Sequence, residues 1–144
     1  MEEITQFCTF HLDQFLFGVD VRKVQEVIRS LKLTRVPLAP DVISGLINLR
    51  CEIVTAIDLR LRLELPPRPP EVEPMNVVVQ TGAEAVSLLV DAIGAVVTVA
   101  PDTFEKPPET LTGVARDLIL GAYKLKDRLL LALDVEKAIQ GATA

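Results

Sequence analysis

Residues 45–59 read GLINLRCEIVTAIDL, and the pattern returns without a gap as GAYKLKDRLLLALDV in residues 121–135. The two stretches share glycine, leucine, alanine and aspartate at matching positions, and Arg50 of the first is matched by Lys126 of the second. Such an ungapped echo indicates two copies of one small structural unit. Two related units present related surfaces on two sides, which favours a bridging protein over an enzyme with a single pocket.

Each copy of the repeat has the pattern of a β-hairpin with a short turn. The turns, residues 49–52 and 125–128, lie between apolar runs, and two-residue hairpin loops favour glycine, asparagine or aspartate because they need a positive φ. We therefore expect Arg50 and Lys126 to project from the two turn tips. Cys51 occupies a position that suits glycine or aspartate better.

Further apolar runs of strand length predict a mostly β architecture. These runs cover residues 6–12, 15–19, 77–80, 86–90 and 96–99. The first two flank Asp13 and Gln14 and read as a hairpin. Four aspartates each close an apolar run, where a carboxylate can accept orphan backbone N–H groups, and we interpret all four as caps. They are Asp20, Asp58, Asp91 and Asp134.

Residues 21–28 are the exception to the β pattern. Three apolar side chains there fall on one helical stripe, at Val21, Val24 and Ile28. Asp20 precedes the stripe and can cap the first turn. The spacing predicts a short amphipathic helix with Glu26 on its solvent face.

Residues 64–74 hold five of the ten prolines of the chain. Proline cannot occupy a central strand or a helix interior without losing a backbone hydrogen bond, so we expect an extended, exposed connector between the two copies. A ligand for a proline-binding domain is the alternative for this segment.

Composition excludes several classes of function. The 144 residues are 49% hydrophobic, enough to bury a real core, and the net charge of −5 without a basic block argues against a nucleic-acid surface. Cys8 and Cys51 form no CxxC pair, and His11 is the single histidine, so the sequence predicts neither a disulfide framework nor a metal site. No nucleophile or phosphate-binding motif is present, and we expect no catalytic residues and no cofactor. The start Met-Glu-Glu and the lack of a long apolar run predict a cytoplasmic protein.

Two segments together resemble the CheW family of bacterial chemotaxis coupling proteins. They are FGVDVRKVQEV at residues 17–27, and GLINLRCEIV at residues 45–54 leading to IDLR at residues 57–60. The resemblance covers nearly the whole chain. It implies a mostly β, CheW-like domain over residues 1–144, built from two five-stranded SH3-like barrels with short helices. The expected subdomains are residues 13–65 and 75–134, with the proline-rich connector at 64–74, and the N-terminal strand and C-terminal helix packing across them.

The resemblance also implies a function without catalysis. Proteins of this family are adaptors that couple chemoreceptors, the methyl-accepting chemotaxis proteins, to the regulatory domain of a CheA-type histidine kinase, in the cytoplasm at membrane receptor arrays. By matching position, the kinase-binding residues are Asn48, Leu49, Arg50 and Glu52. The receptor-binding residues are Val24, Glu26 and Val27.

Three departures and two alternatives accompany this interpretation. The turn glycine of the family is Cys51 here, the proline usual in the next strand is Thr55, and the stretch before Gly121 carries an extra Leu-Thr-Gly at residues 111–113. The first alternative is a CheW-like adaptor of a parallel pathway, such as twitching motility or a developmental kinase system. The second is of another class, a small β-barrel ligand or thiol sensor centred on Cys51.

Overall fold

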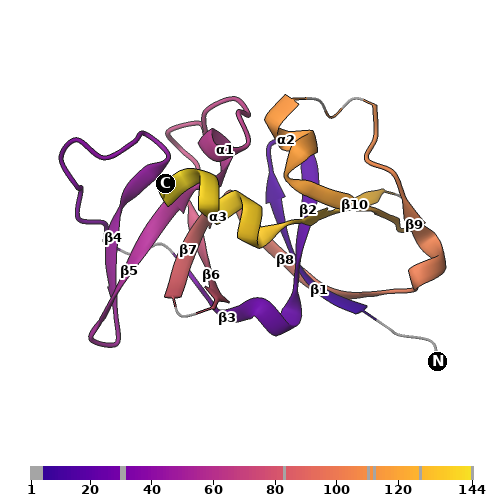
Figure 1. The fold of residues 1–144 in the computed structure, drawn as a ribbon, viewed down its shortest axis with the longest axis horizontal. Helices are drawn as coiled ribbons and strands as arrows, with labels where there is room; N and C mark the ends of the chain where they lie inside the picture. The colour runs from indigo at the N-terminus through magenta and orange to yellow at the C-terminus, as the bar shows by residue number, and fades with distance from the viewer. Residues whose placement is uncertain are drawn as a thin grey trace.

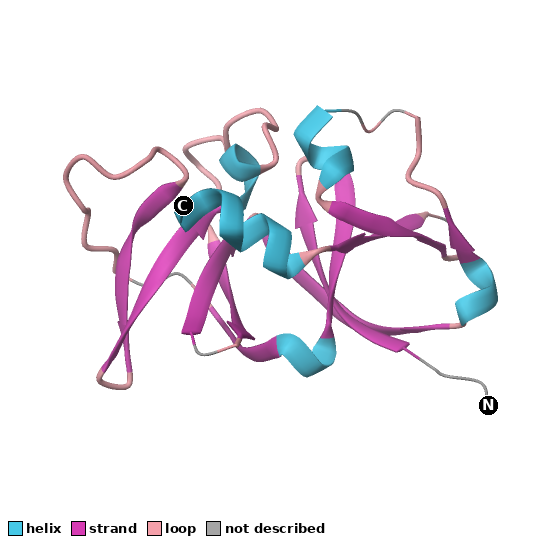
Figure 2. Ribbon diagram, viewed as in Figure 1, coloured by secondary structure: helices cyan, strands magenta, loops and turns pink. Residues whose placement is uncertain are grey.

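The structure is a computed structural model that describes residues 5–29, 32–82, 84–109, 111, 113–126 and 128–143, folded as two sheets that stand side by side (Figures 1 and 2). The six-stranded sheet contains, in spatial order, β8 (Ala92–Val99), β1 (Thr5–Leu12), β2 (Phe15–Asp20), β11 (Leu129–Leu133), β10 (Ile119–Lys124) and β9 (Phe104–Glu105). The five-stranded sheet contains β3 (Val24–Ile28), β6 (Met75–Thr81), β7 (Glu84–Val90), β5 (Glu52–Asp58) and β4 (Ile43–Leu49). The predicted mostly β fold is confirmed.

Short helices follow the strand ends. They are the 3-10 helices η1 (Val21–Lys23) and η2 (Pro101–Thr103), and the α-helices α1 (Leu59–Arg62), α2 (Gly113–Asp117) and α3 (Val135–Thr143). None of the helices in the described ranges is long and apolar enough to cross a membrane.

The two copies of the repeat form the two predicted hairpins. β4 pairs antiparallel with β5, and β10 pairs antiparallel with β11. The second strand of each hairpin then pairs in parallel with a strand from elsewhere in the chain, β5 with β7 and β11 with β2. Both sheets therefore follow one plan, and the extra strand of the larger sheet is the two-residue β9, paired with β10.

The chain is divided between the sheets differently from the expected ranges 13–65 and 75–134. β2 lies in the six-stranded sheet, whereas β6 and β7 lie in the five-stranded sheet. The hairpin that opens each half of the chain thus joins the sheet of the other half. The proline-rich segment connects α1 to β6 within one sheet, and the crossings between sheets occur instead at Asp20 and Asp91. Local sequence patterns predict strands but not the distant strands with which they pair. The repeat therefore did not show that each opening hairpin lies in the sheet of the other half.

The helix predicted for residues 21–28 is wrong beyond its first turn. Asp20 does cap η1, because its Oδ1 accepts the backbone N–H of Arg22 at 3.0 Å. The chain then straightens into β3, which pairs antiparallel with β6. Four of the eight residues in the stretch are β-branched, a composition that suits a pleated strand better than a helix. A short apolar run fits both periods, and pairing with β6 decided between them.

A single large core joins the two sheets. It contains Phe10 and Phe17 from the six-stranded sheet and Val79 and Leu88 from the five-stranded sheet, all essentially inaccessible to water. β6 and β7 lie in the interior of their sheet, and most of their residues are buried. The shared core fixes the surfaces of the two sheets relative to one another.

Candidate functional site

The turn between β4 and β5 has the geometry that the sequence predicted. Arg50 has a φ of 52° and Cys51 a φ of 68°, so both central residues of the two-residue loop are left-handed. Positive φ at both positions characterises a type I′ turn, whose twist matches that of the flanking strands. Arg50 therefore stands at the turn tip, with its side chain 79% exposed.

The residues predicted with Arg50 for kinase binding differ in their placement. Asn48 and Glu52 are exposed, but Leu49 is buried in a small core beneath the hairpin. Leu49 therefore anchors the turn and offers no surface to a partner. Ile53, which the sequence did not single out, pairs directly with Asn48 across the hairpin and is 63% exposed. The sequence feature that could have identified Ile53 is an apolar residue next to a polar turn.

Glu26 lies against Arg50. Arg50 Nη2 donates to Glu26 Oε1 at 3.0 Å, and the Glu26 side chain is 18% exposed. The predicted solvent position of Glu26 is therefore wrong, because residue 26 belongs to a strand. A β-bulge between Val24 and Glu26 shifts the register at this point, and bulges re-aim side chains.

The pair brings together a residue predicted for kinase binding and one predicted for receptor binding. β3 and β4 are the two outer strands of the five-stranded sheet, so the ion pair bridges its edges near the turn. The other carboxylate oxygen of Glu26, Oε2, is buried without a hydrogen-bond partner among the described residues. A buried acceptor left unpaired destabilises the protein. We call Glu26, Asn48, Arg50 and Ile53 the turn surface.

The remaining receptor-binding candidates point in different directions. Val24 is half-buried and packs against the shared core, whereas Val27 is 41% exposed. Glu26 and Val27 are neighbours on a strand, so their side chains leave opposite faces. A partner that touches both must therefore cover the outer edge of β3.

Cys51 gives a direct test of the turn. Replacing Cys51 by glycine should raise the free energy of unfolding by roughly 0.5 kcal/mol, because glycine adopts a positive φ without strain and this outweighs the added freedom of the unfolded chain. Cys51 is exposed, so little packing is lost. Urea titration of both proteins measures the difference. A lower unfolding midpoint for Cys51→Gly would show that the thiol makes a stabilising contact.

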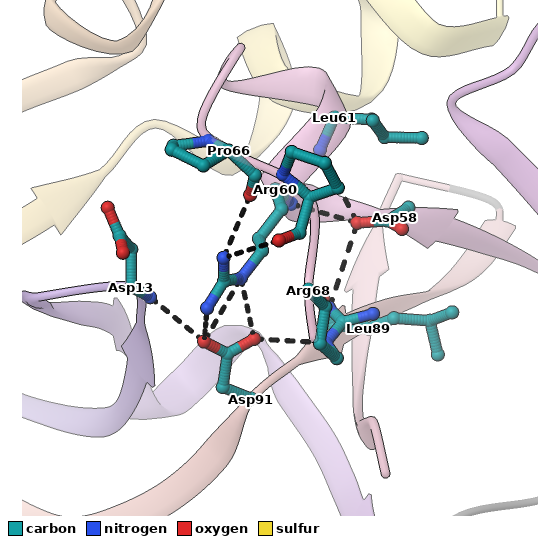
Figure 3. Close-up of polar contacts among 9 residues, drawn as sticks. Asp13, Asp58, Arg60, Leu61, Pro66, Arg68, Leu89 and Asp91 are labelled. Atoms are coloured by element: carbon teal, nitrogen blue, oxygen red, sulfur yellow. Dashed lines mark hydrogen bonds and ion pairs between the residues drawn. The ribbon is translucent and has the colours of Figure 1, made fainter. Parts of the chain in front are cut away.

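A second polar cluster lies where the two sheets meet (Figure 3). Arg60 Nε donates to Asp91 Oδ1 at 2.9 Å, and Arg68 Nε donates to the same oxygen at 3.0 Å. The backbone N–H of Asp13 donates to Asp91 Oδ2 at 2.9 Å, and Arg68 also lies 3.7 Å from Asp58. We call Asp58, Arg60, Arg68 and Asp91 the buried ion cluster.

The parallel pairing of β5 and β7 explains the cluster. Asp58 ends β5 and Asp91 directly follows β7, so both lie at the same edge of the sheet. Two carboxylates at one edge need cations, which Arg60 and Arg68 supply from either side. Burial alone would raise the pKa of Asp91, but the hydrogen bonds from Arg60, Asp13 and Arg68 outweigh it and hold that pKa below its usual value. The hydrogen bond with Asp91 likewise raises the pKa of Arg60.

The cluster changes two expectations from the sequence. Asp58 and Asp134 accept backbone N–H groups at the starts of α1 and α3, as caps should, whereas Asp91 precedes a strand and receives two guanidinium groups. Arg68 stands in the tract predicted to be exposed, yet its side chain is only 9% exposed. Arg60 Nη1 donates to the carbonyls of Pro66 and Pro67, at 2.8 and 3.2 Å. The tract is therefore fastened to the protein.

The buried ion cluster and the turn surface differ in what they present to a ligand. The carboxylates of the buried ion cluster are occupied by cations, and the described residues include no group of three His, Cys, Asp or Glu side chains placed to hold a metal ion. What the turn surface offers is an exposed guanidinium and an exposed isoleucine, with the Glu26 carboxylate paired beside them. Such a surface suits recognition of another protein.

Comparison with known proteins gives the family. The model of the CheW-like domain matches residues 6–143. The chain belongs to the CheW family. It is 28% identical to the chemotaxis protein CheW of Treponema pallidum, covering 94% of this chain and 82% of that protein. It is 30% identical to CheW of Klebsiella aerogenes, with 93% and 81% covered.

A solved structure agrees with the fold. The scaffolding protein TtCheW from Thermoanaerobacter tengcongensis superimposes with a TM-score of 0.81 at 27% identity, covering 91% of this chain and 89% of that one. Within the CheW family the chain is a scaffolding, non-enzymatic protein of chemotaxis, as the sequence predicted. Family membership favours this adaptor over the thiol sensor centred on Cys51.

Proposed function

We propose that the chain couples chemoreceptors to the regulatory domain of a CheA-type histidine kinase in the cytoplasm, at membrane receptor arrays. The observation that supports the proposal is the Glu26–Arg50 ion pair, which brings a residue proposed for receptor binding against one proposed for kinase binding at the edges of the five-stranded sheet. The relatives are named chemotaxis proteins, which favours chemotaxis over a twitching or developmental pathway.

On the kinase side we propose Asn48, Arg50 and Glu52, with Ile53 added from the geometry. Arg50 carries five N–H donors in a planar group, which suits a carboxylate or a pair of carbonyls on the partner. Its exposed side chain can reach outward while one nitrogen holds Glu26. Ile53 adds apolar area beside it, and interfaces combine such apolar contacts with a few directed polar ones.

On the receptor side we propose Glu26 and Val27, with Val24 holding β3 against the core. Glu26 presents a carboxylate that is paired with Arg50, and Val27 is exposed apolar area on the same strand. A receptor that hydrogen-bonds Glu26 would compete with its contact to Arg50. Binding of one partner would thus alter the group presented to the other.

Arg50 is the residue on which this function most depends. Arg50→Ala should weaken binding to a CheA regulatory domain by about 2 kcal/mol, roughly thirtyfold in Kd, because a central arginine anchor and its hydrogen bonds are lost. Titration calorimetry with the purified domain measures the change. Unfolding should shift by less than about 1 kcal/mol, as is usual for an exposed ion pair.

Lys126→Ala is the matched control. Lys126 holds the corresponding position of the other repeat and is exposed, but it lacks the asparagine-leucine-arginine sequence of the first turn. We expect its loss to change Kd by less than about fivefold. Equal and small losses in the two variants would move the kinase interface away from the turn surface.

A further inference from the structure

Strand β3 pairs with β6 in a register that contains a β-bulge. The bulge lies between Val24 and Glu26, so β3 carries one extra residue there. Beyond the bulge, the paired residues are Glu26 with Val78, Val27 with Val77 and Ile28 with Asn76. This register leaves the side chain of Glu26 only 18% exposed, whereas Val27 is 41% exposed. A carboxylate is thus held against the protein next to a valine that meets water.

Apolar burial alone does not explain this register. Moving residues 26–28 by one position along β6 would remove the bulge and send each of the three side chains to the opposite face of the sheet. Val27 would take the place of Ile28 against the small core beneath the β4–β5 hairpin, and Ile28 would lie opposite Met75. Glu26 would take the exposed place of Val27. The shifted register therefore keeps the apolar contacts of the strand and returns the carboxylate to water, so polar contacts must favour the observed one.

A buried pair of polar side chains lies at the end of β3. Asn76 of β6 and Ser87 of β7 are 2 and 0% exposed. Asn76 Nδ2 donates to the carbonyl of Arg29, the residue that directly follows β3, at 3.2 Å. Ser87 Oγ donates to Asn76 Oδ1 at 2.8 Å. Because the hydroxyl occupies the amide oxygen, the amide nitrogen is turned toward the end of β3.

The contact with Arg29 is specific for the observed register. A shift of one residue moves a strand by about 3.3 Å, which carries the Arg29 carbonyl out of hydrogen-bond distance from Asn76. The buried amide nitrogen would then lose its acceptor, and an unpaired buried donor is destabilising. The Glu26–Arg50 pair favours the same register, but Arg50 is 79% exposed, and exposed ion pairs contribute little.

We propose that Asn76 and Ser87 are positioning residues that hold β3 in its bulged register and so place Glu26 beside Arg50 in the turn surface. Buried polar groups can specify a register because only one alignment satisfies their hydrogen bonds. The consequence for receptor binding rests on the proposed function. The register itself is a property of the free chain, so it is tested without a partner.

NMR spectroscopy of the isotope-labelled intact protein tests the register. Asn76→Leu/Ser87→Ala replaces both polar groups by apolar ones, a change that can leave overall stability nearly intact. We expect a second set of amide resonances for residues 24–28, with about a tenth or more of the intensity, because the penalty on the shifted register is removed. In this second set the cross-strand contact of Val27 with Val77 should be replaced by a contact of Glu26 with Val77.

Three single variants separate positioning from other effects. Leu89→Ala opens a cavity in the same small core and lowers stability without touching the polar pair, so it should give one set of resonances. Arg50→Ala removes the ion pair and should also give one set. Ser87→Ala leaves the Asn76 amide without its orienting partner and should give a smaller second set. This variant keeps the test decisive if the double variant does not fold.

The positioning role is overturned if both polar-pair variants give a single set of resonances with the contact of Val27 to Val77 retained. It is equally overturned if Leu89→Ala or Arg50→Ala produces a second set as large as theirs. Receptor binding of the same variants is measured separately. A shifted register with unchanged receptor binding would leave the positioning role intact and contradict the proposed receptor contact of Glu26.

Discussion

Asp91→Asn should lower the free energy of unfolding by about 3 kcal/mol, because it removes the charge that balances two buried guanidinium groups. Removing one member of a buried pair costs far more than the pair itself contributes, since the remaining charges stay desolvated. Urea titration followed by circular dichroism measures the loss. Asp20→Asn, at the equivalent crossing, is the matched control, and we expect it to cost less than about 1 kcal/mol because its partner is exposed.

The Asp91 carboxylate also makes the free energy of unfolding depend on pH. The pKa of Asp91 is lower in the folded protein than its ordinary value of 3.8, so its contribution is fully present above that value and is lost as pH falls through the folded pKa. The unmodified protein should therefore lose stability below about pH 4 more steeply than Asp91→Asn. Parallel acid titrations with slopes that coincide would show that Asp91 is not the group responsible.

Gly45→Ala should cost about 3 kcal/mol, because the new methyl group has nowhere to go. Its Cβ would stand 2.6 Å from the carbonyl oxygen of Thr34, and a backbone atom in a paired segment cannot step aside. Thr34 and Leu46 exchange two backbone hydrogen bonds here, at 2.9 and 2.8 Å, which hold the segment of Thr34 against β4. Gly45 also has a φ of +154°, a region that side chains rarely adopt.

Gly82→Ala separates the clash from the backbone strain. Gly82 has a φ of +56°, yet a Cβ there would meet no atom within 4 Å. Alanine should therefore cost only about 1 kcal/mol, the price of a left-handed conformation. Thermal or chemical unfolding of both variants gives the comparison. Similar losses at the two positions would mean that Thr34 moves away and that the close approach is not constraining.

The repeat was a reliable guide to local structure for a physical reason. Gly45 and Gly121 coincide because both stand at β-bulges where a side chain would strike a neighbouring segment. The turn at Arg50 was predictable from its length, since a two-residue loop between antiparallel strands has few possible conformations. These features depend on residues close together in the chain, where sequence patterns are informative.

What the sequence concealed depends on distant pairing. Glu26 could be placed beside Arg50 only once residues 24–28 were known to be an outer strand and not a helix. The burial of Arg68 could not be predicted, because the sequence of a proline-rich segment does not show whether the segment packs against the rest of the protein. Asp91 resembled the capping aspartates in its local sequence, and its partner Arg60 is supplied by another strand end. Hydrophobic periodicity and secondary-structure propensity do not predict such contacts.

The exchange of hairpins between the two halves bears on how such a chain could arise. A lone copy of the repeat would hold one hairpin for its own sheet and another that fits only a second copy. Two separate copies could satisfy each other by trading hairpins, which is the arrangement of a domain-swapped dimer. The present chain has that geometry within one polypeptide, with the proline tract as the join. It is built as an intertwined dimer whose two protomers have been fused, so neither half has a complete sheet of its own.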